Sequence, residues 1–272
     1  MSPINERRPL LGHGSNIPSR VATSDEENIV ETIGIKFIKR KSWFHRAILK
    51  RVIDMDEGSL GRSVIIAICV ATASASGAFI YYVLLEFLLE FFWHTLPRKL
   101  LVEAPWISES FYVLWIPIIV FPMAFLLGLS VIYIGEPGDL AYTVKCVHQK
   151  GFVALDHVTP MLVASQFSIL GGGSLGPEAP LVAICAALGG FISQTVFESR
   201  KRNVIRKHTL MGMAGALSAF FGAPLGGSMF ALEVNSKFGV EYFEHMIEAI
   251  LCGVITLGLF RYFAGTTFDE EL

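Results

Sequence analysis

The stretch GGGSLGPEAPLV, residues 171–182, interrupts a part of the chain that is otherwise apolar. The windows Val158 to Pro177 and Ala179 to Phe197, on either side of Glu178, contain no Asp, Glu, Lys or Arg. Three consecutive glycines, two prolines and one carboxylate in such surroundings predict a break between two helices. What surrounds the break decides the fold.

The composition is that of an integral membrane protein. Hydrophobic residues make up 53% of the 272 residues, charged residues make up 17%, and the mean hydropathy is +0.54. A membrane-spanning helix needs about 20 apolar residues. Charge-free windows of this kind occur at 63–85, 111–134, 158–177, 179–197 and 209–232, and a shorter apolar run occupies 249–260. Because these runs are continuous, we predict an all-α, polytopic membrane protein with about eight membrane helices of unequal length.

Two further clusters of glycine and proline, GEPGD (135–139) and GAPLGG (222–227), lie within or beside apolar segments. Irregular backbone at membrane depth is tolerated only where it is buried in protein or lines a wet cavity, so we expect tilted and discontinuous helices around a pathway. Pro177 and Pro180 suit the first turn of a helix. This places Glu178 at the N-terminus of a half-helix, where N–H groups and the helix dipole favour an anion.

Stability does not explain a carboxylate at this position. A charge at the bilayer centre costs about 2.5 to 3.5 kcal/mol, and the helix dipole returns about 1 kcal/mol or less. We interpret Glu178 as a gate and a proton carrier, whose carboxylate occupies the anion position and leaves it on protonation. The alternative is that Glu178 caps its helix or faces a water-filled loop.

The segment GPEAPLVAICAALG resembles the glycine, any residue, glutamate, glycine, proline signature of the CLC chloride channels and chloride/proton exchangers. SLGPE resembles the form found in plant and algal members, and RKHTLMGMAGALSAFFGAPLGGSMFALEV is similar to the following helix pair of the family. The resemblance spans about residues 60–265 and implies the first half of an inverted-repeat fold. It implies that Glu178 is the gating glutamate. The anion-binding residues that it implies are Gly135, Pro137, Gly138, Gly176, Pro177, Ala179, Pro180, Leu181 and Val182.

Two departures from the family pattern bear on function. Pro137 stands at or beside the serine of the first selectivity segment, where plant members that favour nitrate also carry proline, so nitrate is a hypothesis beside chloride. After SMFAL the family has two acidic positions, which here are Glu233 and Val234. The apolar second position favours passive conduction or altered coupling, so channel and antiporter both remain open. Glu233 is a candidate for the proton path, although a helix-end pair with Lys237 is its preferred interpretation.

The chain stops about where the first half of the family ends, and the second-half segments that complete the anion site have no match in it. Three interpretations are open: a truncated product, the first part of a longer protein, or a half-length subunit that pairs with a second half. We expect no selective anion conduction from this chain alone. The rival functions are a scaffold or regulatory subunit and a broken-helix transporter for an organic anion. For a full-length member the resemblance implies a homodimer.

We divide the chain into a disordered cytoplasmic tail (1–24), an amphipathic surface helix (25–58), a transmembrane domain (59–265) and a polar C-terminal end (266–272). Basic residues between 36 and 51 place the N-terminus in the cytoplasm. A second basic loop, ESRKRNVIRKH, occupies 198–208. Glu6, Leu10 and Leu11 resemble the acidic dileucine sorting motif of endosomal, lysosomal and vacuolar membrane proteins, and a tail without sorting function is the alternative.

The sequence predicts no catalytic or cofactor chemistry. Cys69, Cys146, Cys185 and Cys252 stand singly in apolar or helical surroundings, so we expect buried free thiols. The histidines lack metal-ligand spacing, and no pairing of a nucleophile with a base stands near the membrane segments. We therefore expect no enzyme, no metal, no cofactor and no nucleic-acid partner. The expected partners are chloride or other small anions and the lipid bilayer.

Overall fold

The apolar windows fold into helices, as the absence of water in a bilayer requires of their backbone. The computed structural model describes residues 60–99, 112–235 and 245–268, all within one compact unit that spans residues 41–272. Every regular element in these residues is a helix, which confirms the all-α prediction. The predicted tail (1–24), the predicted surface helix (25–58), the dileucine-like residues and residues 269–272 lie outside the described residues.

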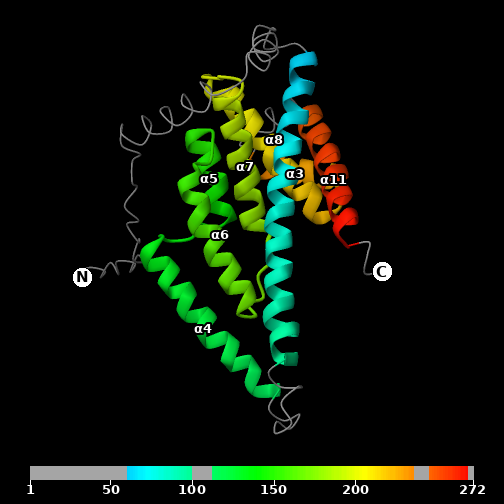
Figure 1. Cartoon of the computed structure of the whole chain (residues 1–272). Helices are drawn as coiled ribbons and strands as arrows, with labels where there is room; N and C mark the ends of the chain where they lie inside the picture. Colours follow the sequence, from blue (N-terminus) through cyan, green and yellow to red (C-terminus); the bar gives the residue numbers. More distant parts are fainter. Residues whose placement is uncertain (1–59, 100–111, 236–244, 269–272) are drawn as a thin grey trace, which may run out of the picture. The chain divides into compact units, whose positions relative to one another are not determined.

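Figure 1 shows the helices in chain order. They are α3 (Leu60–Glu90), which continues into the π-helix η1 (Phe91–Thr95), then α4 (Tyr112–Tyr133), α5 (Leu140–Lys150), α6 (Leu155–Leu170), α7 (Glu178–Thr195), α8 (Arg202–Phe221), α9 (Pro224–Asn235) and α11 (Met246–Phe268). Among the described residues, four stretches are long and apolar enough to cross a membrane: Gly61–Thr95, Leu114–Tyr133, Glu178–Thr195 and Met246–Gly265. The chain is therefore a polytopic helical protein.

The predicted window 209–232 is not one helix but two. Gly222 ends α8 with a φ of +66°, in the left-handed region that favours glycine, and Pro224 begins α9, where a proline needs no N–H partner. The break predicted from GAPLGG is thus confirmed. α8 also begins earlier than the window, at Arg202, because charged side chains end a hydropathy window without ending a helix.

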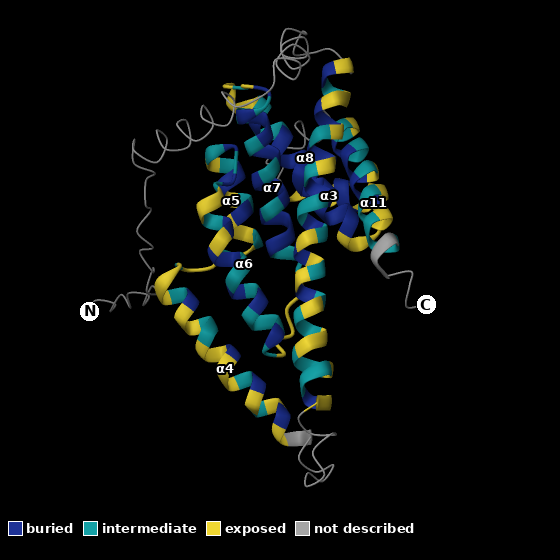
Figure 2. Ribbon diagram, in the orientation of Figure 1, coloured by how far each residue is buried: buried dark blue, intermediate teal, exposed yellow. Residues whose placement is uncertain are grey.

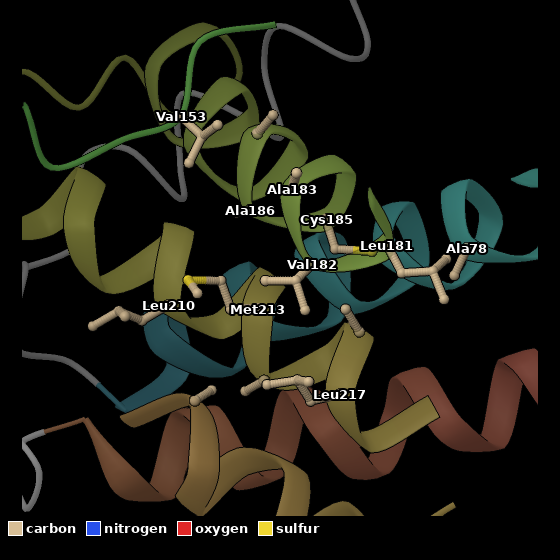
Figure 3. Packing of buried hydrophobic residues seen from close by; sticks show 14 of the residues in the cluster. Ala78, Val153, Leu181, Val182, Ala183, Cys185, Ala186, Leu210, Met213 and Leu217 are labelled. Atoms are coloured by element: carbon tan, nitrogen blue, oxygen red, sulfur yellow. The ribbon is translucent and has the colours of Figure 1, made fainter. Parts of the chain in front are cut away.

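The closest helix contact joins α7 to α8. A Cβ atom added to Gly189 would overlap the carbonyl oxygen of His208, and one added to Gly212 would overlap the carbonyl oxygen of Cys185. The two backbones therefore touch at two levels. Ala183 and Ala186 of α7 are buried in the hydrophobic core nearby (Figure 3). Small residues at these positions let the two membrane helices pack closely.

A group of buried hydroxyls joins α8, α9 and α11. The Ser218 hydroxyl donates to the carbonyl of Pro224 at 3.1 Å, and the Ser228 hydroxyl donates to the carbonyl of Ala249 at 3.1 Å. The two hydroxyl oxygens lie 3.3 Å apart. Both serines are fully buried, so these hydrogen bonds satisfy groups that would be costly to leave unpaired.

Among the described residues, the helix α4 packs mainly along one side. Trp115 lies in a cluster with Leu170 of α6, and its indole N–H donates to the carbonyl of Phe92 at 3.1 Å. The other side of α4 carries Phe121 and Ile132, which are 75% and 77% exposed. Figure 2 shows exposed positions in yellow along this helix. An exposed apolar side of this kind is what a helix presents to lipid.

Candidate functional site

Three glycines end α6 at the site of the predicted break. The N–H of Gly171 donates to Phe167, that of Gly172 to Ile169 and that of Gly173 to Ser168, each at 2.9 Å. Gly172 has a φ of +80°, which glycine adopts without steric cost. The glycine run therefore satisfies the last carbonyls of α6 and turns the chain out of the helix.

Two prolines begin α7 on the other side of the break. Pro177 is the residue before the first helical turn, Glu178 is the first residue of α7, and the N–H of Leu181 donates to the Pro177 carbonyl at 3.1 Å. This confirms the prediction that Glu178 stands at a helix N-terminus. Pro180 is buried within the first turn, where its missing N–H costs no hydrogen bond.

α7 is longer than the half-helix that the sequence predicts. It has 18 residues and is long and apolar enough to cross a membrane. Gly189 and Gly190 lie within this helix, and both are close to residues of α8.

The Glu178 carboxylate turns back over the break. A Cβ atom on Gly176 would overlap both carboxylate oxygens of Glu178, so the side chain lies against the main chain of Gly176. Glu178 is half-buried, and residues 172–176 are exposed. The carboxylate therefore sits over the amino end of α7, in a space that exists because residue 176 has no side chain.

The other residues assigned to this part of the site divide by burial. Gly176 is exposed, and Pro177 and Ala179 are half-buried beside Glu178. Leu181 and Val182 are 5% and 0% exposed, and their side chains belong to the core, where Leu181 lies beside Ala78 of α3 (Figure 3). Leu181 and Val182 can therefore contribute to the site through their main chain and not through their side chains.

The break between α4 and α5 contains a carboxylate that sequence reasoning missed. Asp139 caps α5, and its Oδ1 accepts a hydrogen bond from the N–H of Tyr142 at 2.6 Å. The family resemblance implies Gly135, Pro137 and Gly138 as anion-binding residues of this break and does not include Asp139. The signal was present, because aspartate directly before a helix is a favoured N-cap. The chain therefore supplies its own carboxylate at this helix start.

The helices α5 and α7 start at the two breaks and run side by side, but the residues of the two breaks have different nearest neighbours. α5 packs against α7, and both helices run in the same direction from the ends that carry the breaks (Figure 1). The atoms nearest to a Cβ on Gly135 or Gly138 belong to Pro160, Tyr142 and Met161, in α5 and α6. Among the described residues, therefore, the closest neighbours of the first break are not those of Gly176.

The remaining predicted residues lie away from this break. Glu233 is exposed near the end of α9 beside Val234, and Lys237, its expected partner, lies outside the described residues. All four cysteines are free thiols, as predicted, but the predicted burial holds for three of them. Cys146, Cys185 and Cys252 are buried, and Cys69 is half-buried.

These features define a class, a polytopic helical membrane protein whose helices are interrupted by glycine and proline, with carboxylates at the starts of α5 and α7. Residues 123–268 match the family model described as voltage gated chloride channel. The chain belongs to this family, as the resemblance of its motifs predicts.

The chain is similar to named members of the family over part of its length. It is 38% identical over 114 residues to the H(+)/Cl(-) exchange transporter ClcA of Klebsiella pneumoniae. These residues make up 40% of this chain and 23% of that protein. Identity to ClcA of Yersinia pestis is 37% over 113 residues, with the same coverage. Identity to the human H(+)/Cl(-) exchange transporter 5 is 34% over 92 residues, 33% of this chain and 11% of that protein. The chain thus spans less than a quarter of the length of these relatives.

Proposed function

We propose that this chain contributes to anion transport across a membrane through a CLC-type pathway in which Glu178 is the gate. The observation that carries this proposal is the position of the Glu178 carboxylate, which lies over Gly176 at the amino end of α7. The family match covers this segment. Chloride is the proposed substrate, because the similar proteins are named as H(+)/Cl(-) exchange transporters.

The physical basis is competition between a tethered and a free anion. The N-terminus of a helix attracts negative charge through its dipole and its N–H groups. In the proposed closed state the Glu178 carboxylate occupies this position. When the carboxylate is protonated it loses its charge, leaves the position, and a permeating anion takes its place. Gly176, Pro177 and Ala179, with the main chain of residues 180–182, would line the site, and residues 135–138 would contribute from the α5 side.

Two observations favour different modes of transport. The relatives are named as exchangers, which supports coupling between the anion and a proton. Val234 follows Glu233 at the exposed end of α9, and an apolar residue there supports passive conduction. Under either mode Glu178 carries the gating role. Proline at position 137 is the reason to include nitrate among the anions that are tested.

Chloride binding tests the proposal without requiring a complete conduction path. Substitution of Glu178→Gln removes the charge and keeps the shape, so chloride should bind the variant about tenfold more tightly than the unaltered protein. Isothermal titration calorimetry on the purified full chain measures this change, with nitrate titrated in parallel. The matched control is Glu90→Gln, which makes the same charge change at an exposed position at the end of α3 and should leave the affinity unaltered.

Equal chloride affinity in the Glu178→Gln variant and the unaltered protein would overturn the gating role. Absence of chloride binding in both would favour the alternative function, a non-conducting half-subunit or scaffold that acts with a second half.

A further inference from the structure

Two basic segments that lie far apart in the sequence meet at the carboxyl end of α5. Nη2 of Arg202, at the start of α8, donates to the main-chain carbonyls of His148 at 2.8 Å and Gln149 at 2.7 Å. Nη2 of Arg206 lies 3.5 Å from Nδ1 of His148. The last turn of α5 and the first turns of α8 are therefore held together.

The turn after α5 fits directly beneath this arginine. Gly151 has a φ of +87°, and a Cβ atom on it would lie 3.0 Å from Cγ of Arg202. The preceding residue, Lys150, adds a further positive charge to the same place. We call Lys150, Arg200, Lys201, Arg202 and Arg206 the basic face.

Three residues of the basic face, Arg200, Lys201 and Arg202, are exposed, and Lys150 and Arg206 are half-buried. The face carries a clear excess of positive charge. In the segment 196–207 the only acidic residue is Glu198. Glu248 of α11 pairs with Lys207, whose Nζ lies 2.5 Å from Oε1, so that carboxylate is engaged outside the basic face.

The folding of α8 does not account for this charge. α8 has no acidic residue in its first turn. Cations at the positive end of a helix dipole are electrostatically unfavourable. Arg202 offsets this by binding the carbonyls of α5, but within the described part of the chain the exposed Arg200 beside it makes no such contact to α5. The excess charge therefore points to an anionic partner.

We propose that the basic face binds the phosphate headgroup of an anionic phospholipid. The face follows directly on α7, a candidate membrane-spanning helix that ends at Thr195, so it lies where headgroups meet the protein. Arginine forks match phosphate oxygens in geometry as well as in charge. Basic residues just outside a membrane helix attract anionic lipids. The proposal concerns the other end of α7 from Glu178 and does not depend on the gating role.

A titration with a short-chain lipid tests the proposal. The full chain in phosphatidylcholine nanodiscs is titrated with dioctanoyl phosphatidylinositol 4-phosphate, and bound lipid is counted by native mass spectrometry. The double variant Arg200→Gln with Lys201→Gln should bind the lipid about 30-fold more weakly, given the contribution of each basic residue near a membrane surface. Arg202 is left in place because it holds α5.

The matched control makes the same charge change at the far end of α3. Arg98 and Lys99 are both exposed and follow the span Gly61–Thr95. The double variant Arg98→Gln with Lys99→Gln should bind the lipid as the unaltered protein does. If the first double variant does not fold, Arg200→Gln alone should weaken binding about fivefold.

Three results would overturn the proposal. The first is equal weakening in both double variants, which would mean that only net charge matters. The second is equal binding of dioctanoyl phosphatidylcholine, which would mean that the headgroup is not recognised. The third is inorganic phosphate that competes with the lipid at the same concentration, which would identify a free anion as the occupant. None of these results bears on chloride binding at Glu178.

Discussion

The break before α7 and the body of α7 use glycine for opposite purposes. In the break, Gly172 and Gly176 are exposed. Gly172 lets the backbone turn, and Gly176 leaves room for the Glu178 carboxylate. In the body of the helix, Gly189 is buried against the backbone of α8, and Gly212 of α8 is buried against the backbone of α7. Glycine at the break therefore shapes the site. Glycine at the contact of α7 with α8, which we call the crossing, lets the two helices pack together. The same substitution should then have different consequences in the two regions.

The largest effect is expected at the crossing. In a Gly212→Ala variant the new Cβ would overlap the carbonyl oxygen of Cys185 and lie 2.8 Å from its carbonyl carbon. Both atoms belong to the backbone and cannot rotate away, so the two helices must separate. We expect a loss of about 3 kcal/mol in the free energy of unfolding, measured by thermal or denaturant unfolding in detergent.

The control for this prediction is Gly258→Ala in α11. A Cβ atom on Gly258 meets no atom within 4 Å, and alanine favours the helix more than glycine does. This variant should unfold at the same temperature as the unaltered protein or slightly above it. If the two variants were equally stable, close contact at the crossing would not be the reason for glycine there.

An intermediate effect is expected where the break turns. Gly172→Ala places a Cβ in open space, since no atom lies within 4 Å, but at a φ of +80°. The cost is backbone strain alone, about 1 to 2 kcal/mol in the free energy of unfolding. Asparagine tolerates this conformation better than alanine does. Gly172→Asn should therefore be the more stable variant in the same unfolding assay, and the reverse order would show that strain is not the cause.

The smallest effect on stability, and the clearest effect on the site, is expected at Gly176. In a Gly176→Ala variant the three atoms nearest to the new Cβ belong to the Glu178 carboxylate, the end of a flexible side chain that can rotate away. The free energy of unfolding should change by about 0.5 kcal/mol or less. Because the carboxylate is displaced, chloride affinity in the calorimetric assay should rise toward that of Glu178→Gln.

Combining the two substitutions sharpens this last prediction. If both act by removing the same carboxylate from the same position, the double variant Gly176→Ala with Glu178→Gln should bind chloride no more tightly than Glu178→Gln alone. Additive gains would mean that Gly176 acts independently of Glu178.

The sequence predicted much of the fold because apolar length and helix breakers are local signals. The window 111–134 became α4 (Tyr112–Tyr133), and the prolines beside Glu178 marked the start of α7 correctly. Charge was the weaker guide to helix ends. Glu86 closed the first predicted window, yet α3 continues through it to Glu90, because one charged side chain does not interrupt helical hydrogen bonding.

The features that could not be predicted from the sequence depend on contacts between distant segments of the chain. α5 is polar and lies outside every charge-free window, although Asp139 and Gly151 mark its two ends. The Glu178 carboxylate lies over Gly176 because of its side-chain rotamer, and a pattern of residue types does not predict a rotamer. The clamp of Arg202 on α5 joins residues more than fifty positions apart, so only the folded chain shows it.

The burial of the native thiols has a practical consequence for labelling the break before α7. Cys146, Cys185 and Cys252 are enclosed by neighbouring side chains, and Cys69 alone is half-accessible. A Cys69→Ser chain would therefore be almost silent toward water-soluble maleimides. A single cysteine introduced at Ser174, in the exposed segment of the break, would then report by its labelling rate how often that segment is open to water.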